Sequence, residues 1–355
     1  MRPPKSQGLS VIYEADVSKL RRIRPAVVWA VDSIAVVRTR PAKLRRSDLL
    51  DFETRLVLLL RRKSFWKRIS SRVRQWEVER DRDYYTVLSY PKSGRSWLRF
   101  MLCHIESAIS GRPLGRYIHG VVNRRRKEPK FYYVHGVSPH QDLSGYHYER
   151  LWYNPPAGVI FLVRDPVKVV ASFYAHLKTK KFFGIRLDEG CRFKNFIADP
   201  KIGIRRYEEY LAFYVQSIRK SGVPVLMLRY EDLLADTKHE LGRILRFSEL
   251  PANEAVIGQI VEAASFEKMR AAEEQNLYKA AWLAPGKKGD ASSLKTRGAF
   301  RKGRYVEYED EERALVEAIL KRSPIFKAFG YSAEGIGPYH EADVYDAITA
   351  YSETV

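Results

Sequence analysis

Four short apolar runs, each followed by polar residues, constrain the fold of this chain most strongly. The runs are TVL at 86–88, FYYV at 131–134, VIFLV at 159–163 and VPVLML at 223–228. They are brief and mostly β-branched or aromatic, as strands buried on both faces of a parallel sheet are. Helical patterns are expected over 96–109, 167–177, 207–220 and 237–247. This alternation predicts an α/β domain with a central, mainly parallel sheet flanked by helices.

Each predicted strand leads into a polar cluster. The clusters are PKSGRS after the first run, HG after the second, RDP after the third and RYED after the fourth. In open α/β sheets, ligands bind outside the carboxyl ends of the strands. Because the first cluster is cationic and contains glycine, we expect a phosphate-like ligand there.

The charge is distributed unevenly along the 355 residues, and it divides the chain into three parts. Residues 1–80 carry 20 Lys or Arg and 8 Asp or Glu, whereas residues 331–355 carry five acids and neither Lys nor Arg. We expect a basic, helical extension over 1–80, the main domain over 81–330 and an acidic tail over 331–355. An apolar stripe with a seven-residue spacing runs through 47–80. It is expected to pack on the main domain or a second subunit, with peripheral contact to an anionic membrane as the alternative.

The overall composition favours a soluble, cytoplasmic protein with an anionic partner. The net charge is +21, which suits nucleic acid, an acidic membrane surface or phosphate and sulfate groups on a small ligand. Cys103 and Cys191 are too few for a disulfide framework and lack metal-ligand spacing. No apolar run reaches the roughly 18 residues of a membrane span, and the first 20 residues lack a signal-peptide core.

The stretch SYPKSGRSW at 89–97 joins the first predicted strand to the first helix. A glycine-containing turn at this place presents backbone N–H groups at a helix N-terminus, where anions are stabilised. Lys92 and Arg95 add cations, and Ser93 and Ser96 add hydroxyl groups. The Walker pattern GxxxxGK[ST] is absent, because no second glycine stands five residues before Gly94. The stretch therefore predicts an anion-binding turn of a different kind.

Two further segments carry cations in suitable places. In VIFLVRDPVKVVASFYAH at 159–176, Arg164 ends a strand, Pro166 suits the first turn of a helix, and Ser172 follows eight residues after Arg164. The alternative is that Arg164 and Asp165 form a solvated capping pair. The RKG segment at 301–303 could alone be any basic surface cluster.

Taken together and in this order, the segments resemble the sulfotransferase family that uses 3′-phosphoadenosine 5′-phosphosulfate (PAPS). The resemblance covers about residues 84–330 and implies a P-loop-like α/β fold for the main domain. YPKSGRSW resembles the family's loop for the 5′-phosphosulfate, and RDPVKVVASFY its segment for the 3′-phosphate. LRYEDLLAD with ELGRIL resembles its strand-and-helix block, and RKG its C-terminal phosphate clamp.

The resemblance also implies roles for single residues. Lys92 would contact the bridging oxygen and neutralise charge on the leaving phosphate, which makes it both a catalytic and a nucleotide-binding residue. The remaining nucleotide contacts would come from Ser93, Gly94, Arg95 and Ser96 for the 5′-phosphate, from Trp97, Tyr210 and Phe266 for adenine, and from Arg164, Ser172, Arg301, Lys302 and Gly303 for the 3′-phosphate. Helix packing is the alternative for Trp97.

The general base is expected at the end of the second strand, where the family has a histidine. In FYYVHGVSPH the match is His135, with His140 as its competitor. The sequence departs from the family at two positions. Tyr133 stands where a lysine is common, and Arg95 stands where a hydroxyl residue is usual, so we expect Lys92 and another cation, such as Arg95, to stabilise the transferred group.

The predicted activity is in-line transfer of a sulfuryl group from PAPS to a hydroxyl or amine acceptor, with no metal. Small-molecule, lipid and saccharide acceptors all remain open, and no nucleic acid partner is expected. A P-loop-type nucleotide kinase is the first alternative, although the chain lacks a Walker loop and a clear magnesium-holding acid. A basic membrane-surface or nucleic-acid-binding protein without enzyme activity is the second alternative.

Overall fold

A computed structural model of the chain describes residues 84–120, 129–136, 155–179, 182, 185–251, 253–275, 277 and 308–354. The chain divides into two units, Met1–Arg80 and Asp81–Val355, and every described residue lies in the second unit. The predicted extension over 1–80, including the apolar stripe over 47–80, therefore lies outside the described residues.

The second unit is built on a four-stranded parallel sheet. Its strands are β1 (Tyr85–Ser89), β2 (Phe131–Val134), β3 (Gly158–Val163) and β4 (Val225–Arg229), in the spatial order β2-β1-β3-β4. Val87 of β1 stands opposite Tyr133 of β2 and Ile160 of β3. All residues of β1 and β3 are buried, which explains why these strands read as continuous apolar runs. The prediction of a parallel α/β sheet is confirmed.

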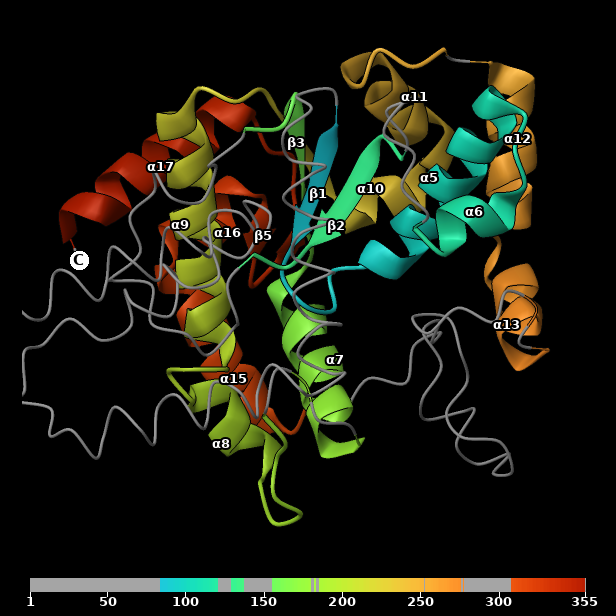
Figure 1. The fold of residues 1–355 in the computed structure, drawn as a ribbon. Helices are drawn as coiled ribbons and strands as arrows, with labels where there is room; N and C mark the ends of the chain where they lie inside the picture. Colours follow the sequence, from blue (N-terminus) through green and yellow to red (C-terminus); the bar gives the residue numbers. More distant parts are fainter. Residues whose placement is uncertain are drawn as a thin grey trace, which may run out of the picture. The chain divides into compact units, whose positions relative to one another are not determined.

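Helices cover both faces of this sheet (Figure 1). They are α5 (Arg95–Ser110), α6 (Leu114–Ile118), α7 (Pro166–Thr179), α8 (Phe193–Ala198), α9 (Ile204–Ser221), α10 (Tyr230–Ala235), α11 (Thr237–Phe247), α12 (Glu254–Ala263), α13 (Phe266–Glu274), α15 (Asp310–Arg322), α16 (Pro324–Ala328) and α17 (Glu341–Thr354). A two-stranded antiparallel hairpin, β5 (Tyr331–Ser332) and β6 (Gly335–Ile336), lies between α16 and α17 in the chain. The helices predicted over 96–109, 167–177, 207–220 and 237–247 fall within α5, α7, α9 and α11.

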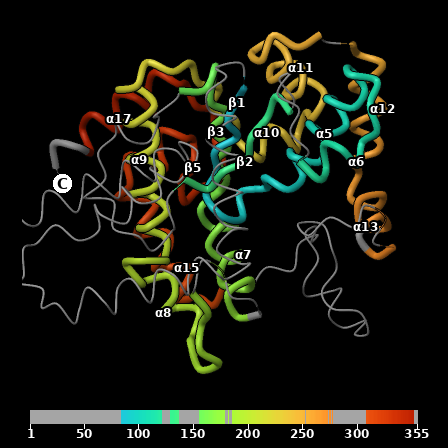
Figure 2. Tube along the Cα trace, viewed as in Figure 1, coloured from blue at the N-terminus to red at the C-terminus, as the bar shows by residue number. Residues whose placement is uncertain are grey.

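The sheet separates two hydrophobic cores. Successive residues of a strand point to opposite faces, so Phe161 joins one core while Ile160 and Leu162 join the other. The Phe161 core contains residues of α7, α8, α9 and α15 to α17. The Ile160 core contains residues of α5, α6 and α10 to α13. The tube view shows these two groups of helices on opposite sides of the strands (Figure 2).

The acidic segment 331–355 is folded onto the domain and does not form a separate tail. Tyr331, Val344 and Ile348 are buried in the Phe161 core. Val344 and Ile348 are four residues apart and share one face of α17, whereas Asp343 and Asp346 are exposed. The composition of this segment thus reflects the solvent-facing side of an amphipathic helix.

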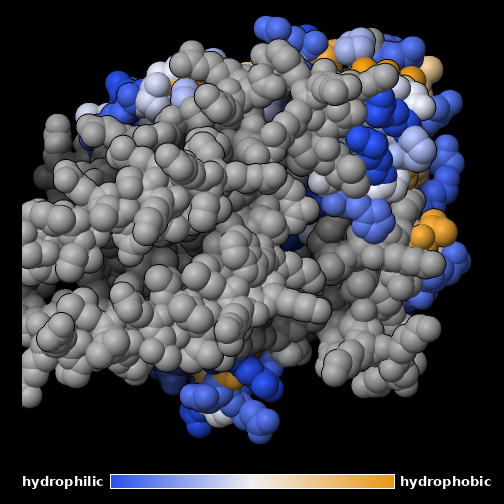
Figure 3. Space-filling view, viewed as in Figure 1, coloured by the Kyte–Doolittle hydropathy of each residue, from blue (hydrophilic) through white to orange (hydrophobic). Residues whose placement is uncertain are grey.

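The visible surface of the described residues is mostly hydrophilic, with scattered apolar side chains (Figure 3). The exposed large apolar residues of the described part come from four separate segments: Ile109, Leu234, Leu277 and Ile336. Within the described residues, no helix combines the length and apolar character that crossing a membrane would require.

Candidate functional site

The turn between β1 and α5 has an unusual backbone. Lys92 has a φ of 74° and Gly94 a φ of 92°, both in the left-handed region. Such a conformation costs a residue other than glycine about 1–3 kcal/mol and is typical of functional sites. Gly94 is the N-cap of the 16-residue helix α5 and, having no side chain, offers no side-chain acceptor to the first N–H groups of the helix. The predicted strand, turn and helix are therefore present, and the turn leads into a helix end that suits an anion.

Tyr230, the first residue of α10, connects the parts of this site. A Cβ atom on Gly94 would lie 2.3 Å from the Tyr230 ring, so only glycine fits there. The rings of Tyr230 and Trp97 meet edge to face at 5.8 Å. The Arg164 guanidinium lies over the Tyr230 ring, 4.2 Å from its centroid. Sequence reasoning did not assign Tyr230 a binding role, although its position in RYED, at the carboxyl end of β4, was the available signal.

Arg164 is fixed beside the turn by several hydrogen bonds. Its Nη1 atom donates to the carbonyl oxygen of Lys92 at 3.0 Å. The Tyr207 hydroxyl donates to the carbonyl oxygen of Arg164 at 3.0 Å and lies 3.1 Å from the Arg164 backbone nitrogen, which donates to it. Asp165 alone acts as a cap, because its carboxylate accepts from the Val167 N–H at 2.8 Å. The structure therefore separates Arg164 from the capping role that the alternative gave it.

The other residues of RYED brace this arrangement. The Glu231 carboxylate accepts from the Asp165 N–H at 3.1 Å and from the Tyr331 hydroxyl at 2.8 Å. Burial raises the pKa of both Glu231 and Asp165. The Arg229 guanidinium forms a bidentate pair with Asp232, at 2.7 Å for both contacts, and also donates to two carbonyl groups near the β5–β6 hairpin. The end of β4 is thereby tied to the start of α7 and to the C-terminal hairpin.

His135 follows β2, and two hydrogen bonds define the state of its imidazole ring. Its Nδ1 atom lies 2.8 Å from the carbonyl oxygen of Ser89. A carbonyl oxygen can only accept, so Nδ1 carries the proton and Nε2 of the neutral ring is an acceptor. That Nε2 atom lies 2.6 Å from Nη2 of Arg95, which donates to it. His135 is therefore held in the tautomer that a general base acting through Nε2 requires.

The surroundings of His135 keep its imidazole neutral. The pKa of His135 is lowered to about 3, chiefly by burial and also by the nearby charges of Arg95, Lys92 and His176, while the Ser89 carbonyl opposes the shift. The Phe182 ring packs edge-on against both His135 and His176, with centroid distances of 5.6 and 5.4 Å. His176 was not anticipated from the sequence, and an isolated histidine within a helix gives no local signal of such a contact.

Contacts with helix α9 also fix the main chain at His135. The Tyr210 hydroxyl donates to the His135 carbonyl oxygen at 3.0 Å. The next residue, Gly136, has a φ of 68°, and a Cβ atom there would lie 1.9 Å from the Tyr214 hydroxyl oxygen. The HG pair thus allows the chain to pass closely over α9.

The predicted adenine contact of Tyr210 is not supported and is corrected here. Tyr210 is 2 % exposed and packs against Tyr90, Phe161 and Tyr214 in the core. Its ring therefore has no free face for a base, and its hydroxyl is used by the His135 carbonyl group. Tyr210 belongs to helix α9, which also buries Tyr207 and Tyr214. Tyr230 itself lies beside Trp97 and Arg164.

The remaining predicted residues fall into two groups. Trp97 packs as a helix residue, since its indole N–H donates to the carbonyl oxygen of Ala264 at 2.9 Å, but its ring also borders Tyr230. Phe266 begins α13, two residues beyond Ala264. Ser93 is fully buried, and Ser96 and Ser172 are partly buried on α5 and α7. The predicted residues Arg301, Lys302 and Gly303, and the competing base His140, lie outside the described residues.

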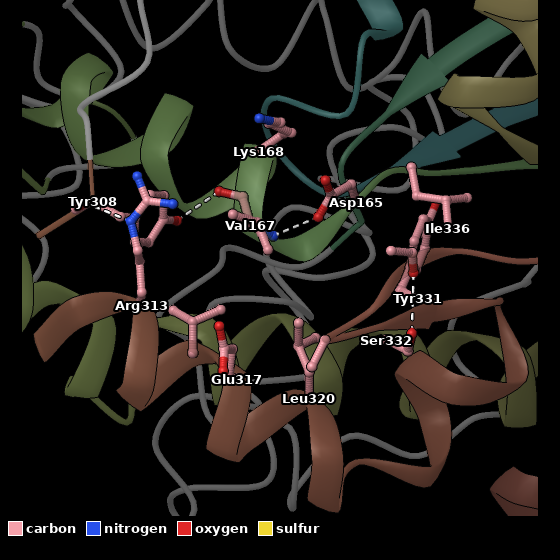
Figure 4. A pocket seen from close by; sticks show the side chains of 13 residues that line it. Asp165, Val167, Lys168, Tyr308, Arg313, Glu317, Leu320, Tyr331, Ser332 and Ile336 are labelled. Carbon is pink, nitrogen blue, oxygen red and sulfur yellow. Dashed lines mark hydrogen bonds between the residues drawn. The ribbon is translucent and has the colours of Figure 1, made fainter. Parts of the chain in front are cut away.

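A cavity of about 420 Å³ lies next to the start of α7 and is lined also by α15 and the β5–β6 hairpin (Figure 4). Lys168 and Arg313 contribute positive charges to its lining, and Asp165 and Glu317 contribute negative ones. None of the predicted site residues that the structure describes lines this cavity, although Asp165 directly follows Arg164. Within the described residues, no three His, Cys, Asp or Glu side chains gather as a metal site would require.

Known proteins provide an independent comparison. Mouse sulfotransferase SULT7A1 complexed with PAP matches with a TM-score of 0.45 and 16 % identity, covering 78 % of this chain and 90 % of that one. Luciferin sulfotransferase of Photinus pyralis is 27 % identical over 240 residues, which cover 56 % of this chain and 59 % of that protein. Sulfotransferase 2A1 of Homo sapiens is 25 % identical over 226 residues, covering 56 % of this chain and 70 % of that protein.

The match to a plant relative has a similar extent. Cytosolic sulfotransferase 14 of Arabidopsis thaliana is 26 % identical over 221 residues, which cover 53 % of this chain and 61 % of that protein. The sequence model of the sulfotransferase domain matches residues 82–311, which is well over half of the chain and includes Lys92, His135 and Arg164. The chain belongs to the sulfotransferase family.

Proposed function

We propose that this protein transfers a sulfuryl group from PAPS to a hydroxyl or amine group of a small acceptor. The observation that carries the proposal is His135, a neutral imidazole with a fixed tautomer, beside the cationic turn that ends β1. Membership of the sulfotransferase family supports the same reaction.

The residues of the turn fit a phosphosulfate group. Gly94 allows the close approach of Tyr230 and offers no side-chain acceptor to the N–H groups at the N-terminus of α5, and Arg164 is held against the Lys92 carbonyl group. Nη1 of Arg95 is buried and no described residue hydrogen-bonds to it, which suits an anionic ligand. Lys92, Ser93, Gly94, Arg95 and Ser96 would hold the 5′-phosphosulfate. Arg164, Ser172 and the RKG segment at 301–303 would hold the 3′-phosphate, and Trp97, Tyr230 and Phe266 would border adenine.

When bound, PAPS supplies the sulfuryl group. The acceptor oxygen or nitrogen forms a bond to sulfur as the bond from sulfur to the 5′-phosphate oxygen breaks, and its electron pair stays on that phosphate oxygen. Nε2 of His135 takes the acceptor proton, because Nδ1 already carries one. Lys92 and the N-terminus of α5 stabilise the negative charge on the departing phosphate.

The names of the relatives suggest the acceptor class. They include a luciferin sulfotransferase, an amine sulfotransferase and a 3-alpha-hydroxysteroid sulfotransferase. We therefore favour a small molecule, with lipid or saccharide acceptors open, and by the same likeness to cytosolic sulfotransferases a cytoplasmic location. Contact of residues 47–80 with an anionic membrane stays a prediction.

Nucleotide selectivity tests this function. Adenosine 3′,5′-bisphosphate (PAP) and PAPS should raise the melting temperature of the full chain, because binding to the folded state stabilises it. ATP lacks a 3′-phosphate and should raise it far less. Incubation with labelled PAPS and a cell extract, followed by mass spectrometry, should then show a sulfated acceptor. Equal stabilisation by ATP and PAP, with transfer of phosphate instead, would favour the kinase alternative.

A further inference from the structure

The contact between Arg95 and His135 has a consequence for the reaction, and the inference drawn from it rests on the proposed function. The only lone pair of the neutral imidazole is at Nε2, and Nη2 of Arg95 occupies it at 2.6 Å. A lone pair engaged by a guanidinium N–H cannot accept a proton from an acceptor molecule. His135 therefore has the correct tautomer for a base but a closed acceptor site.

Arg95 itself has an unmet requirement. Its Nη1 atom is buried and has no hydrogen-bond partner among the described residues. A charged donor buried without an acceptor is destabilising, so the position favours an additional acceptor. The charge on Arg95 is also disfavoured: its pKa is lowered to about 10, chiefly by burial, with Arg99 acting in the same direction and Tyr210 and Tyr133 opposing the shift. Among the described residues, no carboxylate pairs with Arg95, so an incoming anion would relieve both conditions.

The position of Arg95 relates it to both halves of the reaction. It is the first residue of α5, directly after Gly94, and so belongs to the turn proposed to hold the phosphosulfate. The same side chain crosses from that turn to the end of β2, where His135 lies. Tyr133, two residues before His135, brings no positive charge to this place. Arg95 is thus a cation that extends from the proposed phosphosulfate-binding turn and contacts the proposed base, His135.

We propose that Arg95 controls access to the general base: its guanidinium closes Nε2 of His135 and moves off it when an anionic oxygen binds beside Nη1. That oxygen belongs either to the sulfuryl group of PAPS or to an anionic group of the acceptor. In both cases the anion attracts the guanidinium, Nε2 becomes an acceptor for the hydroxyl proton, and proton removal follows assembly of the complex. Arg95 is in this sense a positioning residue for His135.

A titration of the His135 imidazole by nitrogen NMR tests the closed contact directly. Among the described residues, the charged and titratable groups that act on this imidazole are Arg95, Lys92 and His176, with the Ser89 carbonyl at Nδ1. In Arg95→Ser, removal of a charge in direct contact should raise the pKa of His135 by about one unit or more. Arg95→Lys keeps the charge and should raise it less. Arg246→Ser, an equal change of charge at an exposed position of α11, should leave it unchanged.

Ligands then distinguish the two sources of the anion. If the sulfuryl group takes Arg95, PAPS should shift the Nε2 resonance of the wild-type protein and PAP should not. Arg95→Gln, which keeps a donor without the charge, should reduce the affinity for PAPS relative to PAP by roughly tenfold. If the acceptor supplies the anion, PAPS and PAP should behave alike, and 4-hydroxybenzoate should shift Nε2 where phenol does not.

The pH dependence of transfer gives a third readout. As the pH falls, the rate of Arg95→Ser should begin to decline at a pH about one unit or more above the pH at which the wild-type rate declines, because its His135 becomes protonated at a higher pH. An unchanged pKa of His135 in Arg95→Ser, or a Nε2 resonance that no anion moves, would overturn the inference. If PAPS does not bind the wild-type protein, the proposed function fails separately. Inorganic sulfate then serves as the probe, and an unshifted Nε2 overturns the inference as well.

Discussion

The hydrogen bond from Nδ1 of His135 to the Ser89 carbonyl decides which nitrogen can act as a base. Ser89 ends β1 and His135 follows β2, so this bond depends on the pairing of two neighbouring parallel strands. Tyr210 fixes the main chain of the same residue from α9. Three segments that are distant in the sequence thus fix the position and the tautomer of the His135 imidazole. For this reason the tautomer could not be predicted from the local sequence.

Replacement of Tyr210 by Phe tests whether this tyrosine positions His135 or contacts the nucleotide. The variant loses one hydrogen bond to a carbonyl group, which should lower the free energy of unfolding by about 0.5–1.5 kcal/mol. The affinity for PAP should change less than twofold, while the rate of transfer should fall because the His135 backbone is less constrained. Isothermal titration and single-turnover rates on one preparation measure both effects. A large loss of PAP affinity with unchanged transfer would restore the adenine contact.

At the scale of elements, helices and strands could be predicted from the sequence where buried side chains produce a regular pattern of apolar residues. The run FYYV coincides with β2, although Phe131 alone of its four residues is fully buried, and the pattern over 237–247 coincides with α11, which buries one face. The left-handed Lys92 and the contacts of Tyr230 gave no such signal, since they depend on how β1, β3 and β4 end side by side. The acidic composition of 331–355 gave no indication of the amphipathic helix α17.

The packing of α17 leads to a stability prediction. Ile348 is buried against the main core, so Ile348→Ala should lower the free energy of unfolding by roughly 2–5 kcal/mol through lost burial and a residual cavity. Asp346→Ala, on the exposed side of the same helix, should change it by less than about 0.5 kcal/mol. Urea unfolding of both variants measures the difference. Equal, small effects would mean that α17 does not contribute to the fold.

At the scale of the whole described unit, strand order explains why the site is assembled. The order β2-β1-β3-β4 with all strands parallel places the ends of β2, β1 and β3 next to one another. His135, the turn at Lys92 and Arg164 follow these three ends, and Tyr230 follows β4. The sequence therefore allowed the prediction that these polar clusters share one edge of the sheet. The contact between Arg95 and His135 required the coordinates, because it depends on where two side chains extend from that edge.

The most direct test of the central claim separates binding from chemistry at His135. In His135→Ala, the affinity for PAPS should remain within a few-fold of the wild-type value, because Lys92, Arg164 and the helix end are intact. The rate of sulfuryl transfer should fall by roughly 10²–10⁴-fold, the usual contribution of a positioned general base. The loss should be larger for alcohols than for acidic phenols, whose proton is easily removed. His140→Ala, measured in parallel by calorimetry and sulfate transfer, should retain its rate. A normal rate in His135→Ala with a collapsed rate in His140→Ala would contradict the account.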